Sequence, residues 1–193
     1  MIIYIHGFGS SGRGGKSLQL LEYFKSQNIP SISPSLSYVP ELAIDTLEQL
    51  IESYDEVTLI GSSLGGFYSI YLAEKYGLKA VLINPAVDSS KTLKRMLSLN
   101  GMATNYYDGT HFEWRQNHID MLLNYKVEDI KNGEYFLLLQ TGDDVLDYRD
   151  ALAKLPNAKS IVEEGGTHPF EGIERHFESI RDYVMAISPY RLG

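Results

Sequence analysis

The stretch VTLIGSSLGGFYSIYLAEKY, residues 57–76, joins an apolar run to a helical pattern through a turn of small residues. The turn reads GSSLG, residues 61–65, and matches G-x-S-x-G with Ser63 at the centre and Ser62 beside it. In this motif a sharp turn between strand and helix exposes a nucleophilic serine, and the glycines prevent collisions with neighbouring elements. The strand–turn–helix context predicts that Ser63 is a nucleophile. A glycine-rich turn that only packs closely is the alternative.

Short apolar runs alternate with longer helical patterns along the rest of the chain. The predicted strands are Ile2–Ile5, Ser31–Ser33, Val57–Ile60, Ala80–Ile83, Tyr135–Leu139 and Ser160–Val162. The predicted helices are Ser17–Ser26, Glu41–Ser53, Leu64–Tyr76, Tyr148–Lys154 and Glu171–Ile187. Such alternation, with strands that are continuously apolar, indicates a parallel sheet covered by helices on both faces. We therefore expect a single domain over residues 1–193, a three-layer α/β/α sandwich with a mostly parallel six-stranded sheet.

Residues 86–131 interrupt this alternation. No strand is predicted there, whereas Leu93–Leu99 and Phe112–Asn124 have helical patterns, so we expect a helical lid inserted over one end of the sheet. Phe112 and Trp114 are candidate substrate-binding residues, because their apolar side chains are suited to lining an acyl pocket. Packing against the core is the alternative interpretation of the same side chains.

Composition narrows the classes of partner. The net charge is −8, with 17 Lys and Arg against 25 Asp and Glu. This balance disfavours nucleic acid or an anionic membrane as the main partner, because phosphate binding needs a basic surface. The chain contains no cysteine, which excludes disulfides, thiolate metal sites and cysteine nucleophiles. No secretory signal and no apolar run of membrane-spanning length is found, so we expect a cytoplasmic protein.

A serine nucleophile needs a base and a group that orients the base. TGDDVLDY, residues 141–148, follows one predicted strand, and GGTHPF, residues 165–170, follows the next. Loops at the carboxyl ends of parallel strands form the active sites of open α/β sheets, so His168 is the predicted base. Asp143 and Asp144 directly follow their strand and are the candidate acids, with Asp143 favoured. The later carboxylates are expected to begin the next helix.

The loop HGFGSSG, residues 6–12, follows the first predicted strand. Its glycines match G-x-G-x-x-G, but the second predicted strand ends without the carboxylate that a dinucleotide ribose needs, so no cofactor is expected. The better interpretation is an oxyanion loop, in which the backbone N–H groups of Phe8 and Leu64 hold the charge of a tetrahedral intermediate. His6 is then expected to close the strand end. The histidines outside these loops lack metal-ligand spacing, so no metal site is expected.

Five different motifs are spread over almost the whole chain. They read IYIHGFGSS, LIGSSLGGFYS, LINPAV, LLLQTGDDVLDY and EEGGTHPFEGIERHF. Together they resemble the α/β-hydrolase superfamily, and more closely the small bacterial esterases of the YqiA type. The resemblance implies a compact hydrolase fold with strand order 2-1-3-4-5-6, a triad of Ser63, His168 and Asp143, and no cofactor. It also implies hydrolysis of a small-molecule carboxylic ester, for which we expect short to medium acyl chains. A thioesterase or acyltransferase, a small peptidase and a non-catalytic binding module on the same fold are the alternatives.

Overall fold

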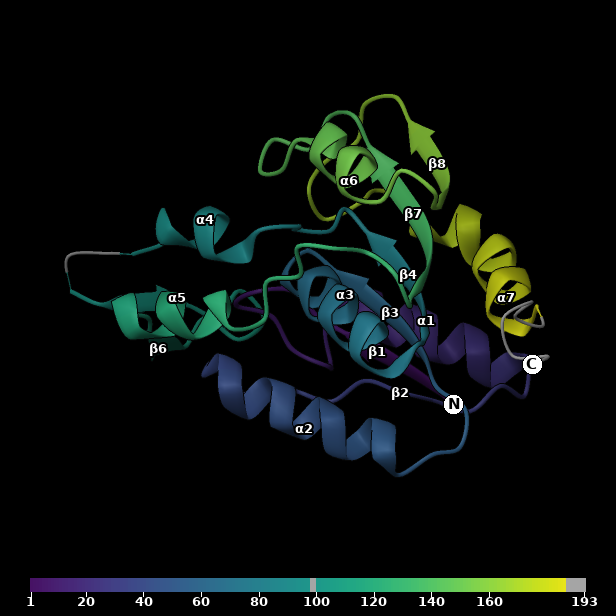
Figure 1. Cartoon of the computed structure of the whole chain (residues 1–193), viewed down its shortest axis with the longest axis horizontal. Coiled ribbons are helices and arrows are strands. Elements are labelled where there is room, and N and C mark those ends of the chain that lie inside the picture. Colours follow the sequence, from purple (N-terminus) through teal and green to yellow (C-terminus); the bar gives the residue numbers. More distant parts are fainter. Residues whose placement is uncertain (98–99, 187–193) are drawn as a thin grey trace.

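A computed structural model describes residues 1–97 and 100–186 of the chain. The strands of its central sheet are β1 Ile2–Ile5, β2 Ser31–Ile32, β3 Thr58–Ser62, β4 Lys79–Ile83, β7 Glu134–Gln140 and β8 Lys159–Glu163. They pair in parallel in the order β2-β1-β3-β4-β7-β8 (Figure 1). Counted along the chain, these are strands 2-1-3-4-5-6, so the expected six-stranded parallel sheet is confirmed.

Helices cover both faces of this sheet, which confirms the three layers. On one face pack α2 (Pro40–Glu52), α3 (Leu64–Tyr76) and α6 (Tyr148–Lys154), and on the other pack α1 (Gly15–Ser26) and α7 (Phe177–Met185). Figure 1 shows α1 and α7 side by side, away from α2. The predicted last helix, Glu171–Ile187, instead begins with a 3-10 turn, η1, at Ile173–His176. Its predicted end at Ile187 lies outside the described residues.

The four central strands, β1, β3, β4 and β7, divide their side chains between two apolar clusters. In β1, Ile3 and Ile5 belong to the cluster under α2 and α3, whereas Ile2 and Tyr4 belong to the cluster under α1 and α7. All four are buried, which explains why the strands read as continuous apolar runs in the sequence. Because the strands are parallel, the loops that follow β1, β3, β7 and β8 meet at one edge of the sheet.

The insertion, residues 86–131, is not purely helical, so that prediction is wrong. It contains α4 (Ser89–Lys94), an antiparallel pair formed by β5 (Met102–Thr104) and β6 (His111–Glu113), and α5 (Gln116–Leu123). The helix predicted over Phe112–Asn124 corresponds to α5, which begins four residues later than predicted, because Phe112 pairs with Ala103 in the hairpin. The predicted helix Leu93–Leu99 lies largely after the end of α4, and its residues 98–99 fall outside the described residues.

Turn chemistry explains the hairpin. The connection between β5 and β6 reads NYYDGT, residues 105–110, and is closed by hydrogen bonds from Asn105 N–H to the Thr110 carbonyl and from Gly109 N–H to the Asn105 carbonyl. Gly109 has φ +74°, a backbone conformation that glycine adopts without steric cost. The Asp108 carboxylate also accepts hydrogen bonds from the backbone and side chain of Thr110. Local turn preferences thus outweigh the helical spacing of the apolar residues.

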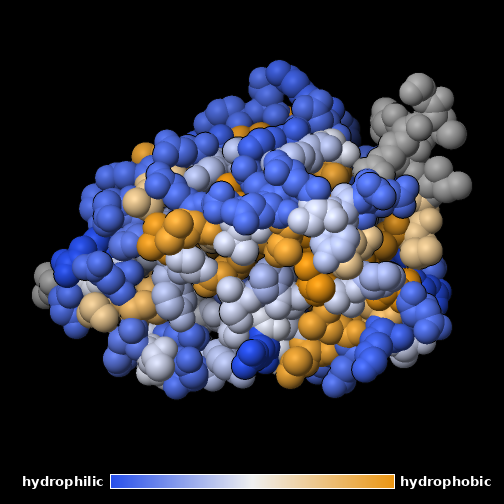
Figure 2. All heavy atoms as spheres, turned by 90° about the horizontal axis from the view of Figure 1, so that it is seen from below, coloured by the Kyte–Doolittle hydropathy of each residue, from blue (hydrophilic) through white to orange (hydrophobic). Residues whose placement is uncertain are grey.

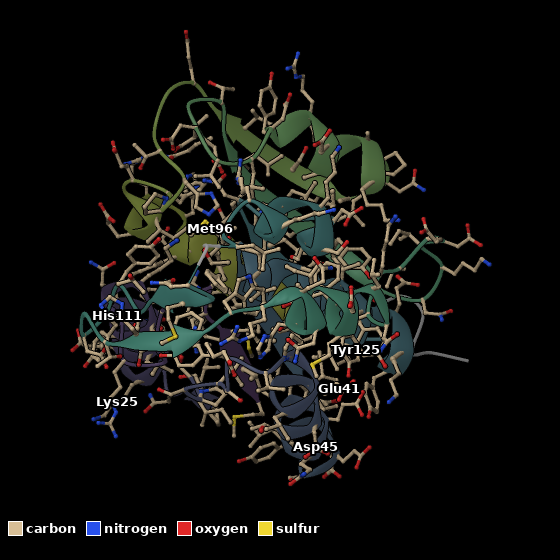
Figure 3. All side chains as sticks on the ribbon, turned by 90° about the vertical axis from the view of Figure 1, so that its left-hand side faces the viewer. Lys25, Glu41, Asp45, Met96, His111 and Tyr125 are labelled. Atoms are coloured by element: carbon tan, nitrogen blue, oxygen red, sulfur yellow. The ribbon has the colours of Figure 1, made fainter. Side chains whose placement is uncertain are left out.

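The insertion lies at one end of the molecule, seen face-on in Figure 3. Tyr125, two residues after the end of α5, lies near Glu41 and Asp45 of α2, which is consistent with the packing of α5 against α2. The hairpin reaches the loop after β1, where Tyr106 N–H donates to the Gly9 carbonyl at 2.7 Å. Seen from below, the apolar surface is divided into patches bordered by hydrophilic residues (Figure 2).

Candidate active site

The turn between β3 and α3 holds Ser63 in a strained backbone conformation. Ser63 has φ 55° and ψ −118°, in the region that non-glycine residues rarely adopt. Two residues later, a Cβ on Gly65 would overlap the carbonyl oxygen of Ile5, so only glycine permits this approach of helix to strand. Strain of this kind persists only where the surrounding structure enforces it, and it concentrates at functional sites. The sharp turn anticipated from the motif is therefore present.

Three side chains from separate loops form a hydrogen-bonded chain at the carboxyl edge of the sheet. The Ser63 Oγ lies 2.9 Å from His168 Nε2, and His168 Nδ1 lies 2.8 Å from Asp143 Oδ2. Because an ionised carboxylate only accepts hydrogen bonds, His168 Nδ1 carries the proton and Nε2 accepts from the serine hydroxyl. The arrangement has the geometry by which a histidine removes a proton from a serine.

Asp143, and not Asp144, contacts His168. The Asp143 side chain is only 2% exposed, and its Oδ1 accepts hydrogen bonds from the Val145 and Leu146 N–H groups. Burial raises the pKa of Asp143, but the hydrogen bonds from His168 and from the two N–H groups outweigh it, so its pKa lies below its usual value. The carboxylate is therefore ionised near neutral pH. Asp144 is exposed, and Asp147 caps α6 as expected.

Two buried polar residues at strand ends hold the histidine loop in place, and sequence reasoning missed both. Asn84, directly after β4, donates from its side chain to the carbonyls of Thr167 and His168. Gln140, the last residue of β7, accepts from the N–H groups of Thr167 and Glu171 through its side-chain oxygen. The sequence did contain a signal for both residues, because each is a polar residue at the end of an apolar strand. Buried polar groups require hydrogen-bond partners.

The loop after β1 lies against the serine. A Cβ on Gly7 would sit 3.2 Å from the Ser63 Cβ, so the glycine allows the backbone to approach closely. The N–H groups of Phe8 and Leu64 have no hydrogen-bond partner among the described residues, as donors for an oxyanion require. His6 closes the strand end: its Nε2 accepts from Leu36 N–H, its Nδ1 contacts the Gly7 carbonyl, and burial lowers its pKa.

Phe112 and Trp114 are packing residues around this loop. Trp114 is 1% exposed and Phe112 is 7% exposed, and both rings meet Phe8 edge-on, at 4.7 Å and 5.3 Å between centroids. The Phe112 ring also stacks on Tyr38 at 3.6 Å. Neither side chain lines the cavity beside Ser63. They pack against the ring of Phe8 and not along that cavity.

Comparison with known proteins shows the family of the chain. The model of the uncharacterised protein family UPF0227 matches residues 1–185. The chain belongs to the UPF0227 family. A UPF0227 protein of Vibrio cholerae is 24% identical over 192 residues, covering 96% of this chain and 100% of that protein.

Solved structures share the fold of this UPF0227 member. Mouse alpha/beta hydrolase domain-containing protein 10 aligns with a TM-score of 0.76 and 18% identity, covering 95% of this chain and 88% of that one. Est1E from Butyrivibrio proteoclasticus, solved with ferulic acid bound, aligns with a TM-score of 0.72 and 13% identity, covering 95% and 85%. At these identities the likeness concerns the fold, which is that of the α/β-hydrolases.

An open cavity of about 240 Å³ lies beside Ser63 and His168. Its lining includes Lys16, at the start of α1, whose Nζ donates to the Ser62 Oγ at 3.1 Å. Ser62, which occupies a variable position of the G-x-S-x-G motif, thus contacts a lysine that sequence reasoning missed. Among residues 1–97 and 100–186, no group of His, Asp and Glu side chains is arranged to hold a metal ion. No helix in the same ranges is long and apolar enough to cross a membrane.

Proposed function

We propose that this UPF0227 member is a serine hydrolase that cleaves carboxylic esters of short to medium acyl chains. The observation that carries the proposal is the hydrogen-bonded chain from Ser63 through His168 to Asp143, anchored on a strained strand-to-helix turn. The N–H groups of Phe8 and Leu64, which have no partner in the described ranges, support the proposal, because a developing oxyanion needs free donors. The hydrolase fold supports the same reaction class, although a fold alone does not define an activity.

In the proposed reaction, Ser63 Oγ attacks the ester carbonyl carbon while His168 Nε2 takes its proton. The Oγ–C bond forms, and the N–H groups of Phe8 and Leu64 hold the oxyanion. Collapse breaks the bond to the alcohol oxygen, which takes the proton from His168. Water then attacks the acyl-enzyme, His168 accepts its proton, and cleavage of the Oγ–C bond returns the proton to Ser63. The sum is ester plus water giving acid plus alcohol, with Asp143 stabilising the imidazolium throughout.

The size of the cavity supports the limit on chain length. Pockets for drug-sized ligands typically enclose about 300–1,000 Å³, whereas the cavity beside Ser63 encloses about 240 Å³. Each buried methylene contributes about 0.8 kcal/mol, so added carbons raise the rate several-fold only until the cavity is filled. Short and medium acyl chains should therefore react faster than long ones.

A panel of p-nitrophenyl esters with acyl chains of about two to twelve carbons tests the activity, with an optimum expected in the lower half of the range. A fluorophosphonate should label one residue, and peptide mapping should place the label on Ser63 and not on Ser62. Absence of both labelling and ester hydrolysis in folded protein would reject the hydrolase proposal. Hydrolysis confined to acyl-thioesters would reject oxygen esters as the substrate class.

A further inference from the structure

Lys16 is a cation without a carboxylate partner beside the candidate active site. Its side chain is half-buried, and within the described part of the chain its one side-chain hydrogen bond goes to the neutral Ser62 hydroxyl at 3.1 Å. No Asp or Glu among the described residues forms an ion pair with it. Lys75, by contrast, pairs with Glu48 at the protein surface. In a chain of net charge −8, a lysine left without a carboxylate in a cavity is unusual.

The surroundings of Lys16 suit an anion. The cavity is lined by Ser63, His168 and the first residues of α1, and no carboxylate of the described residues lines it. Helix α1 has no acidic residue in its first turn and no side-chain cap, so its first N–H groups and the positive end of its dipole remain uncompensated. Ser10 adds a hydroxyl to the same wall. The Lys16 ammonium and the start of α1 favour a negative group, while Asp143, which does not line the cavity, also attracts Lys16.

Holding Ser62 in place does not account for this lysine. A neutral hydroxyl offsets little of the cost of removing an ammonium group from water, and a neutral polar side chain in place of the ammonium would avoid that cost. The cost is visible in the pKa of Lys16, which burial lowers to about 8 in spite of the attraction of Asp143. An incoming anion would supply the missing compensation.

We propose, on the basis of the esterase function above, that Lys16 is a specificity-determining residue that binds a carboxylate carried by the ester substrate. With one ammonium proton donated to Ser62, two remain to bond a carboxylate in the cavity that also contains Ser63. A carboxylate suits the site better than a phosphate dianion, because the wall supplies one full positive charge. The substrates are then half-esters of dicarboxylic acids or esters whose alcohol bears a carboxylate.

Two matched pairs of esters distinguish a carboxylate on the acyl side from a carboxylate on the alcohol side. For an acyl-side carboxylate, p-nitrophenyl hemiglutarate is compared with p-nitrophenyl pentanoate, which has the same number of acyl carbons. For an alcohol-side carboxylate, p-acetoxybenzoate is compared with its methyl ester. The measured quantity is kcat/KM, corrected for spontaneous hydrolysis, in the wild-type protein and in Lys16→Met, Lys16→Gln and Lys16→Arg. Lys25→Met is the control, because Lys25 lies exposed in the last turn of the same helix and its loss changes the net charge equally (Figure 3).

The wild-type protein should prefer the anionic member of one pair. Lys16→Met and Lys16→Gln should lower kcat/KM for that ester by about tenfold or more, the typical loss of a charge-assisted hydrogen bond, and change the neutral ester less than about threefold. Lys16→Arg should retain much of the preference, and Lys25→Met all of it. Two neutral variants are used so that a folding defect in one, detected by circular dichroism, leaves the test intact.

Equal losses on anionic and neutral esters, or an unchanged ratio in both neutral variants, would overturn the role of Lys16. That result leaves the esterase proposal standing, because hydrolysis of the neutral esters and fluorophosphonate labelling of Ser63 are measured separately. Absence of hydrolysis and labelling together would reject the esterase proposal, and the role of Lys16 with it.

Discussion

The candidate site and the insertion over it are built in opposite ways. The site consists of single residues after β3, β7 and β8, held by polar contacts such as those of Gln140 and Asn84. The insertion consists of short elements held by buried rings, among them Phe112 and Trp114. The site stores strain at Ser63, whereas the insertion contributes apolar burial. The contrast indicates that the candidate site depends on polar contacts, whereas the insertion depends on apolar packing.

Ser63→Ala should separate the two roles most sharply. Removal of the nucleophile from a Ser-His-Asp site typically costs about 10⁴- to 10⁶-fold in turnover. The free energy of unfolding should change little, because the backbone turn is retained. Esterase kinetics and urea denaturation measure the two effects. Ser62→Ala, the matched control one residue away, should keep most activity on neutral esters, and equal losses in the two variants would contradict the assignment of Ser63.

Asp143→Asn should cost about 10⁴-fold in kcat, because a neutral amide neither stabilises the imidazolium nor fixes its tautomer. Stability should be affected less, since the amide oxygen still accepts from the Val145 and Leu146 N–H groups. Asp144→Asn is the matched control and should retain nearly full activity. A severe loss in Asp144→Asn with a mild one in Asp143→Asn would place the acid one residue later than the geometry does.

Trp114→Ala should show the reverse pattern. Truncation of a buried tryptophan typically costs about 3–5 kcal/mol of stability, and Trp114 is 1% exposed. Chain-length preference among p-nitrophenyl esters should stay unchanged below the unfolding transition, because the side chain does not line the cavity. Tyr107→Ala, half exposed in the same insertion, should shift stability by less than about 0.5 kcal/mol. An altered chain-length preference in Trp114→Ala would return this residue to the substrate site.

The smallest expected effect is a pH dependence confined to anionic esters. Lys16 binds a carboxylate only when protonated, and burial lowers its pKa to about 8. The ratio of kcat/KM for anionic over neutral ester should therefore be greatest below pH 8 and fall as the pH rises through about 8. The titratable groups that face Lys16 are Tyr4, His168 and Asp143. Burial raises the pKa of Tyr4, so it stays neutral, and the pKa of Asp143 lies below its usual value, so it stays ionised.

Lys16→Arg provides the control for this pH dependence, because an arginine stays charged throughout the accessible range. In Lys16→Arg, the ratio of kcat/KM for anionic over neutral ester should stay constant over the pH range in which the wild-type ratio declines. Measurement of both ratios from about pH 6.5 to pH 9.5 covers the transition. A decline of the same size in Lys16→Arg would assign the titration to another group.

Sequence reasoning predicted the site far better than the insertion. The turn at Ser63, the loop of Asp143 and the loop of His168 each follow an apolar strand, so sheet topology alone brings them to one edge. The insertion has no such repeat. Its apolar residues have helical spacing, yet residues 105–110 form a hairpin turn, and Phe112 is buried by a strand rather than by a helix. Short segments of this kind take their structure from turn chemistry and tertiary contacts.

By itself, the sequence determined the parallel sheet and placed Ser63 and His168 at its carboxyl edge, because periodicity and motif spacing are local properties of the chain. The strand order came from the family resemblance. Only the tertiary structure decided between Asp143 and Asp144, buried Trp114 away from the cavity, and brought Lys16 to Ser62. These outcomes depend on the directions of side chains from segments far apart in the chain. Distances in space between such groups are set by packing, and no local pattern encodes them.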